Sequence, residues 1–181
     1  MKLACYRSTR PGLQGVANRL IRWRLRGPYS HNELVFEPGD GVAALMPDGT
    51  CAADARGALW CASSVAAERL PPWSKRRAGR YGGVRFKRIA LDRARWDLVD
   101  CPADPAQACA RAAQAEGAPY DWRLILGYVA WLVPGQSARW TCNEFCAWCI
   151  GLADPWRFDC NALAAAVALA AQTTHERKPA S

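Results

Sequence analysis

Residues 29–36, with the sequence YSHNELVF, predict a β-strand between the helix-breaking pair Gly27-Pro28 and a Glu-Pro-Gly-Asp-Gly turn at 37–41. Side chains alternate between the two faces of a strand, so His31, Glu33 and Val35 are expected to share one face. His31 is one of only two histidines in the chain. The strand therefore combines a place in a sheet with a side chain suited to acid–base chemistry.

Further elements are predicted on both sides of this strand. Short strands are expected at 3–8, 42–46, 59–65, 83–91 and 96–99, a helix between 13 and 23, and an exposed loop at 68–80. From Pro105 onward the pattern changes to helices, at 105–116, 121–133, 140–151 and 161–172. Strands followed by helices indicate an α+β domain, with helices packed on one face of an antiparallel sheet. One domain is predicted over residues 1–172, and residues 173–181 are predicted to be a disordered polar tail.

The composition agrees with one globular domain. The chain has 181 residues, of which 51% are hydrophobic and 22% charged, and these values exclude wholesale disorder. The start has no apolar run of signal-peptide length, and the longest apolar stretch, 124–133, is about half of a membrane span. We expect a soluble cytoplasmic protein without a transmembrane segment, and delivery to the periplasm by another route stays open.

The net charge and the cysteine content limit the kinds of partner and of cross-link that the sequence predicts. The net charge of +8 gathers in two arginine- and lysine-rich clusters, at 19–26 and 75–80, which we interpret as solvated faces. Because no helix-turn-helix, RNA-binding or zinc-finger spacing accompanies this charge, no specific nucleic-acid partner is expected. The nine cysteines are odd in number, so a disulfide framework is not predicted and most of them are expected in the core.

Cys142 is the cysteine with a setting suited to chemistry. Pro134-Gly135 ends the preceding helix, and a new helical pattern begins close to Thr141, which places Cys142 in the first turn. Unpaired N–H groups and the helix dipole lower the pKa of a thiol at that position and can hold an oxyanion. An imidazole beside it would complete a nucleophile–base pair. His31 is the candidate base, because His175 lies in the predicted tail.

Ser30-His31-Asn32-Glu33 on a strand, followed much later by Cys142-Asn143-Glu144 at a helix start, resembles the permuted papain-like hydrolases of the YiiX/YaeF group. These are circularly permuted relatives of the NlpC-type cell-wall amidases, in which the histidine strand precedes the cysteine helix. Gly82-Gly83-Val84-Arg85 and Tyr120-Asp121-Trp122 are similar to members encoded by bacteriophages and prophages. The resemblance implies a permuted papain-like fold and a cysteine hydrolase that acts on amide bonds.

The resemblance also implies a third, polar residue that orients the histidine. The segment 42–46 offers none, so the candidates are Ser63, Ser64, Asp54 and Glu33. Glu33 faces the same side as His31, but its distance along the strand argues against a bond to the ring. We therefore prefer Ser64 or Ser63.

Four residues near the nucleophile are candidates for supporting roles. Asn143 stands where the family usually has serine and is expected to serve the helix start, while Glu144 would orient the site or cap the helix. Trp140 is a candidate for the lining of a substrate cleft, with core packing as the alternative. Gln136 is in a position for an oxyanion donor, but we interpret it as a polar loop residue. The acyl-enzyme mechanism implied needs no metal or other cofactor.

Three alternatives compete with this hypothesis. Cys142, Cys146 and Cys149 form CxxxCxxC, the cluster-binding spacing of radical S-adenosylmethionine enzymes, although helical periodicity would place them on one buried stripe. A lipid acyltransferase or thioesterase of the lecithin:retinol acyltransferase group has the same order of histidine and cysteine. A phage or host interaction module could retain the fold without activity. Peptide, cell-wall and acyl substrates all remain compatible with the sequence.

Overall fold

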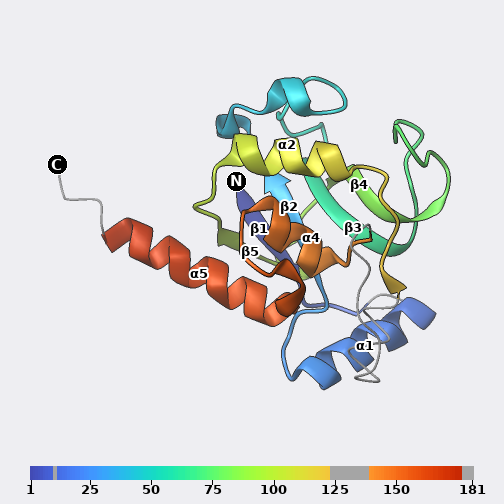
Figure 1. Cartoon of the computed structure of the whole chain (residues 1–181), viewed down its shortest axis with the longest axis vertical. Helices are drawn as coiled ribbons and strands as arrows, with labels where there is room; N and C mark the ends of the chain where they lie inside the picture. Colours follow the sequence, from blue (N-terminus) through green and yellow to red (C-terminus); the bar gives the residue numbers. More distant parts are fainter. Residues whose placement is uncertain (10–11, 123–138, 177–181) are drawn as a thin grey trace.

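The computed structural model, which describes residues 1–9, 12–122 and 139–176, has an α+β fold (Figure 1). Its five strands form one antiparallel sheet in the order β4-β3-β2-β1-β5. The strands are β1 (Lys2–Tyr6), β2 (His31–Phe36), β3 (Leu59–Arg69), β4 (Tyr81–Ile89) and β5 (Trp96–Asp100). The α-helices within the described ranges are α1 (Leu13–Leu25), α2 (Pro105–Ala115), α4 (Cys142–Cys149) and α5 (Cys160–Glu176). The prediction of an α+β fold with an antiparallel sheet is confirmed.

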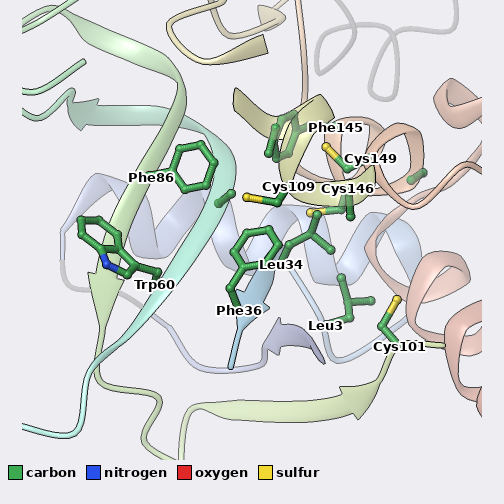
Figure 2. Packing of buried hydrophobic residues seen from close by; sticks show 14 of the residues in the cluster. Leu3, Leu34, Phe36, Trp60, Phe86, Cys101, Cys109, Phe145, Cys146 and Cys149 are labelled. Carbon is green, nitrogen blue, oxygen red and sulfur yellow. The ribbon is translucent and has the colours of Figure 1, made fainter. Parts of the chain in front are cut away.

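The main core lies between one face of the sheet and the helices α2, α4 and α5 (Figures 1 and 2). Alternation along the strands turns Leu34 and Phe36 toward Phe145 of α4 and Leu163 of α5, and all four side chains are fully buried. These three helices pack on one face, as the sequence predicts. A smaller buried cluster, which includes Val35, consists of strand residues whose side chains point to the other face of the sheet.

The chain entering β2 is held against the start of α5. The side-chain carbonyl of Asn161 accepts a hydrogen bond from the Tyr29 N–H at 3.0 Å. Gly27 makes this approach possible, since a Cβ atom there would lie only 2.3 Å from the amide of Asn161. The first residues of β2 and α5 are therefore fixed close together, although they are far apart in sequence.

Some predicted elements differ from the structure. Residues 42–46 do not form a strand but contain a 3₁₀ helix at Ala43–Leu45. The segment lies between two turns, and its N–H groups bond locally, from Leu45 to Val42 and from Met46 to Ala43, rather than to a neighbouring strand.

The ends of two other elements also differ. β3 continues to Arg69, which pairs with Tyr81, so the start of the predicted loop at 68–80 belongs to the sheet. The prediction of a disordered tail from 173 is wrong for residues 173–176, because α5 continues to Glu176. The hydroxyls of Thr173 and Thr174 bond the Ala170 carbonyl within this helix, and 177–181 lie outside the described residues.

The predicted helix at 121–133 lies outside the described residues apart from its first two positions. Across the ranges that are described, no helix combines the length and apolarity needed to cross a bilayer.

Candidate active site

Cys142 is the first residue of α4, and a reciprocal capping box fixes the helix start there. The Thr141 hydroxyl accepts a hydrogen bond from the Glu144 N–H at 3.4 Å, and the Glu144 carboxylate accepts one from the Thr141 N–H at 3.4 Å. Of the two roles considered for Glu144, the structure supports the cap. The Cys142 sulfur thus lies in the first turn, where the helix dipole favours an anion.

The rest of α4 anchors Cys142 to the sheet. Phe145, Cys146 and Cys149 are fully buried in the main core, where Figure 2 shows them above Leu34. Burial raises the pKa of Cys146 and Cys149 well above the ordinary value, so these thiols are inert core groups. Within the described ranges, no three potential metal ligands gather in one place. The CxxxCxxC spacing is therefore the buried stripe of a helix.

His31 is the first residue of β2, the central strand of the sheet. It pairs with Tyr6 of β1, and its ring meets the Trp96 ring edge-on with centroids 6.3 Å apart. The Nε2 of His31 lies 2.8 Å from Oε1 of Glu33, two residues along the same strand. Only 12% of the His31 side chain is exposed. These contacts fix the ring and leave Nδ1 as the nitrogen that can exchange a proton with a thiol.

The start of α4 brings the Cys142 thiol beside the His31 imidazole at the start of β2, close enough for each to shift the pKa of the other. The pKa of Cys142 is held well below its ordinary value, first by the hydrogen bond with the Cys160 thiol and, against the cost of burial, by the attraction of His31. A hydrogen bond from the backbone of Asn32 contributes in the same direction. Burial opposes the imidazolium, but Cys142 and Glu33 outweigh it and raise the pKa of His31 to about 9. The arrangement favours a thiolate–imidazolium pair.

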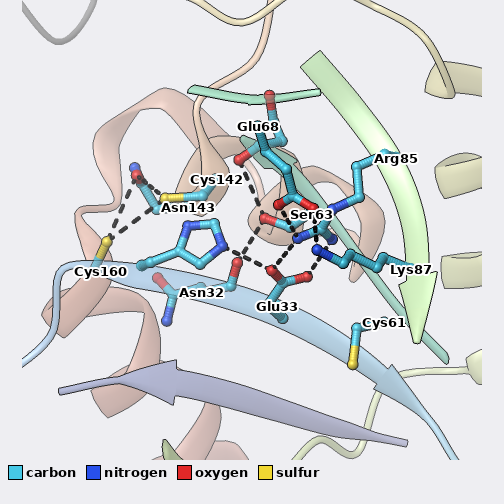
Figure 3. A network of polar contacts seen from close by, with 12 residues as sticks. Asn32, Glu33, Cys61, Ser63, Glu68, Arg85, Lys87, Cys142, Asn143 and Cys160 are labelled. Carbon is cyan, nitrogen blue, oxygen red and sulfur yellow. Dashed lines mark hydrogen bonds and ion pairs between the residues drawn. The ribbon is translucent and has the colours of Figure 1, made fainter. Parts of the chain in front are cut away.

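Glu33 stays ionised although it is completely buried. Arg85 of β4, itself 1% exposed, donates to both of its oxygens at 2.7 Å and 2.6 Å (Figure 3). Burial alone would raise the pKa of Glu33, and the pairing with Arg85 together with the bond from His31 lowers it instead. Arg85 also reaches Glu68 at 3.4 Å, and Glu68 in turn pairs with Lys87. The His31 imidazole is thus oriented by a carboxylate that a buried guanidinium holds in place.

The structure contradicts the preference for Ser64 or Ser63 as the residue that orients His31. The Ser63 hydroxyl donates to the Asn32 carbonyl at 2.7 Å, and the Ser64 hydroxyl donates to the Trp140 carbonyl at 2.7 Å. Both hydroxyls satisfy backbone oxygens, and the ring of His31 bonds Glu33 instead. The distance along the strand does not prevent this bond, because the His31 ring and the Glu33 side chain together bridge two strand positions.

The other residues predicted for the site, Asp54, Trp140 and Asn143, make contacts within the fold. The Asp54 carboxylate accepts backbone N–H groups in its own turn, and the half-buried Trp140 ring packs against Trp148, with centroids 4.8 Å apart. Asn143 bonds the Phe158 carbonyl through its amide nitrogen and, through Oδ1, contacts the Cys142 sulfur at 3.6 Å. Gln136 lies outside the described residues.

Two residues of the site were not predicted. Arg85 was noticed only within the Gly-Gly-Val-Arg motif, although a glutamate in a core strand needs a cation and Arg85 lies between two apolar strand residues. Cys160 was counted among the core cysteines, and no local pattern distinguishes it. Its sulfur lies 3.9 Å from that of Cys142.

Comparison with known proteins does not identify a relative that shares this geometry. No protein-family model, no curated protein and no solved structure matches the chain, so the case for a function depends on the arrangement of Cys142, His31 and Glu33.

Proposed function

We propose that the protein is a cysteine hydrolase of the amidase or peptidase type, with Cys142 as nucleophile, His31 as general base and acid, and Glu33 as the residue that orients His31. The observation that carries the proposal is the place of the Cys142 thiol at the start of α4, beside an imidazole whose Nε2 binds Glu33 at 2.8 Å. A nucleophile bonded to a base that is oriented by a third group is the arrangement needed for acyl transfer.

The chemistry follows from these three groups. The Cys142 thiolate attacks the carbonyl carbon of an amide, and N–H groups at the start of α4 stabilise the oxyanion. The His31 imidazolium gives its proton to the leaving amine, and an acyl-enzyme remains on the sulfur. Neutral His31 then takes a proton from water, which attacks the thioester and releases the acid and the free thiolate. Glu33 keeps the ring in one orientation throughout.

We further propose that the fold is the permuted papain-like one and that the substrate is a peptide, including the peptides of cell walls. The order of His31 before Cys142, the antiparallel sheet and the cysteine at a helix start support this proposal. It also carries forward the resemblance of the Ser-His-x-Glu and Cys-x-Glu segments to the hydrolases of that group.

The test compares the purified full chain with Cys142→Ala and His31→Asn on muropeptides, peptide amides and acyl esters. We expect amide hydrolysis by the wild type and a loss of at least about 10³-fold in kcat/KM for either variant. Cys101→Ala, which removes a buried thiol at the end of β5, serves as the matched control and should retain activity.

Thiol labelling supplies an assay that is independent of substrate. At about pH 6, iodoacetamide should modify Cys142 in the wild type, as located by peptide mapping, since an ordinary thiol is almost wholly protonated there. A slow or unselective reaction would argue for a binding module with an inert cysteine. Hydrolysis of esters but of none of the amides would replace the amidase proposal with a lipid acyltransferase or thioesterase.

A further inference from the structure

The nucleophile has a second thiol as its neighbour. Cys142 begins α4 and Cys160 begins α5, two helices that pack against each other, and their sulfur atoms are 3.9 Å apart. Asn143 contacts both, at 3.6 Å and 3.9 Å from its Oδ1, so the three side chains form a closed triangle (Figure 3). Both residues are buried, with 5% exposure for Cys142 and 3% for Cys160, and all nine cysteines are in the free form.

The two thiols differ in protonation. The hydrogen bond to Cys142 and burial raise the pKa of Cys160 well above its ordinary value, while the same hydrogen bond lowers the pKa of Cys142. These opposite shifts favour a thiolate on Cys142 and a neutral thiol on Cys160. Thiolates are the sulfur species that peroxides oxidise, and a thiol in contact with the product can resolve it to a disulfide.

We propose that Cys142 and Cys160 form a peroxide-sensitive pair, in which oxidation by hydrogen peroxide yields a reversible disulfide that blocks the nucleophile. The formation of the disulfide depends on the sulfur geometry. The loss of activity that it causes rests on the proposed hydrolase function.

The reaction has two balanced steps. The Cys142 thiolate attacks one oxygen of hydrogen peroxide, the O–O bond breaks, and the leaving hydroxide takes a proton from the His31 imidazolium, which gives a sulfenic acid and water. The Cys160 thiol then attacks the sulfenic sulfur and loses its proton in the same step. The S–O bond breaks, and the hydroxide leaves as a second water with that proton. Overall, two thiols and one peroxide give one disulfide and two waters.

The geometry requires only a small closing motion. A disulfide bond is about 2 Å long, so the two sulfur atoms must approach by roughly the same distance from their present contact of 3.9 Å. Each cysteine is the first residue of its helix, where rotation of the side chain does not disturb the interior of the helix. The disulfide protects Cys142 from irreversible oxidation to sulfinic and sulfonic acids.

The test treats the reduced full chain with hydrogen peroxide and follows its intact mass and tryptic map. We expect the loss of two hydrogens, a Cys142–Cys160 cross-linked peptide, and a full return of thiol labelling after dithiothreitol. In Cys160→Ser and Cys160→Ala, Cys142 should instead gain oxygen atoms, and once it is a sulfinic acid, dithiothreitol should not restore labelling. Cys101→Ala is the matched control and should form the same cross-link as the wild type.

Wild-type mapping alone can overturn the proposal, even if the Cys160 variants do not fold. Stable sulfinic acid on Cys142 without a cross-link, or a disulfide between other cysteines, would do so. The readout is also separate from hydrolysis. A cross-link in a protein that hydrolyses no substrate would contradict only the proposed hydrolase function. Hydrolysis without a cross-link would contradict only the proposed Cys142–Cys160 redox pair.

Discussion

The guanidinium of Arg85 binds both carboxylate oxygens of Glu33, at 2.7 Å and 2.6 Å, with neither side chain reaching solvent. This pair crosses the sheet from β4 to β2 and leaves Oε1 of Glu33 in contact with His31 as well. A buried ion pair is weak support for stability by itself, because desolvation offsets much of the attraction. Its role here is to hold a charged acceptor behind the base, and this role can be tested separately from stability.

The first prediction concerns Glu33→Gln. Replacement of the carboxylate removes one of the interactions that raise the pKa of His31, so the high-pH limb of the kcat/KM profile should move to lower pH. The rate at the optimum should fall roughly 10²-fold or more, because the ring loses its charged partner. An unchanged pH profile in a folded variant would assign Glu33 a structural role only.

The second prediction distinguishes the effect of the Arg85–Glu33 ion pair on stability from its effect on activity. Arg85→Met leaves Glu33 buried without its strongest partner and should lower the free energy of unfolding by about 3–5 kcal/mol. The double variant Glu33→Gln/Arg85→Met has no such charge, so in urea unfolding it should be more stable than Arg85→Met. It should nevertheless remain as inactive as Glu33→Gln. Equal or additive losses of stability would show that the two charges are not coupled.

The third prediction concerns the pH dependence of two reactions, the alkylation of Cys142 and the turnover of substrate. Because the pKa of Cys142 is lowered, the rate of alkylation should fall only when the pH drops below that lowered value. Because the pKa of His31 is raised to about 9, the imidazolium is present below about 9 and lost above it. Turnover should therefore decline above about pH 9, since the leaving amine is no longer protonated, while alkylation continues. A parallel decline of both rates would contradict this assignment.

The fourth prediction tests the surroundings of Ser63 and Ser64. Their hydroxyls satisfy buried carbonyl groups of Asn32 and Trp140, so each change to alanine should lower the free energy of unfolding by about 1–3 kcal/mol. Neither hydroxyl bonds His31, and kcat/KM should stay within about threefold of the wild type. Thermal unfolding and steady-state kinetics measure the two effects. A drop of hundredfold in Ser64→Ala at full folding would restore it as a catalytic candidate.

Local patterns were sufficient for the parts of the site that depend on one element. The helix start at Cys142 follows from Pro134-Gly135 and the capping sequence, and the strand of His31 follows from its turn boundaries and alternation. The order of these two elements suggested that they meet, and the pKa shifts of Cys142 and His31 reflect an attraction between the two side chains.

The parts that depend on several elements could not be predicted. Arg85 and Glu33 are partners because β3 lies between β4 and β2, and no local pattern gives this strand order. Cys160 reaches Cys142 through the packing of α5 beside α4, which sequence spacing does not encode. Residues 42–46 form a 3₁₀ turn because the sheet offers them no neighbouring strand, which is again a tertiary property.

His31 and Glu33 belong to one strand and Cys142 to one helix, so the reactive centre is made of only two rigid pieces. Its assembly requires the first turn of α4 to reach the first residue of β2, and the lowered pKa of Cys142 also requires α5 to bring Cys160 beside it. The alkylation rate of the Cys142 sulfur can consequently be used to follow folding. During refolding, fast labelling at mildly acidic pH should appear in step with the burial of Phe145, the residue that seats the helix on the sheet.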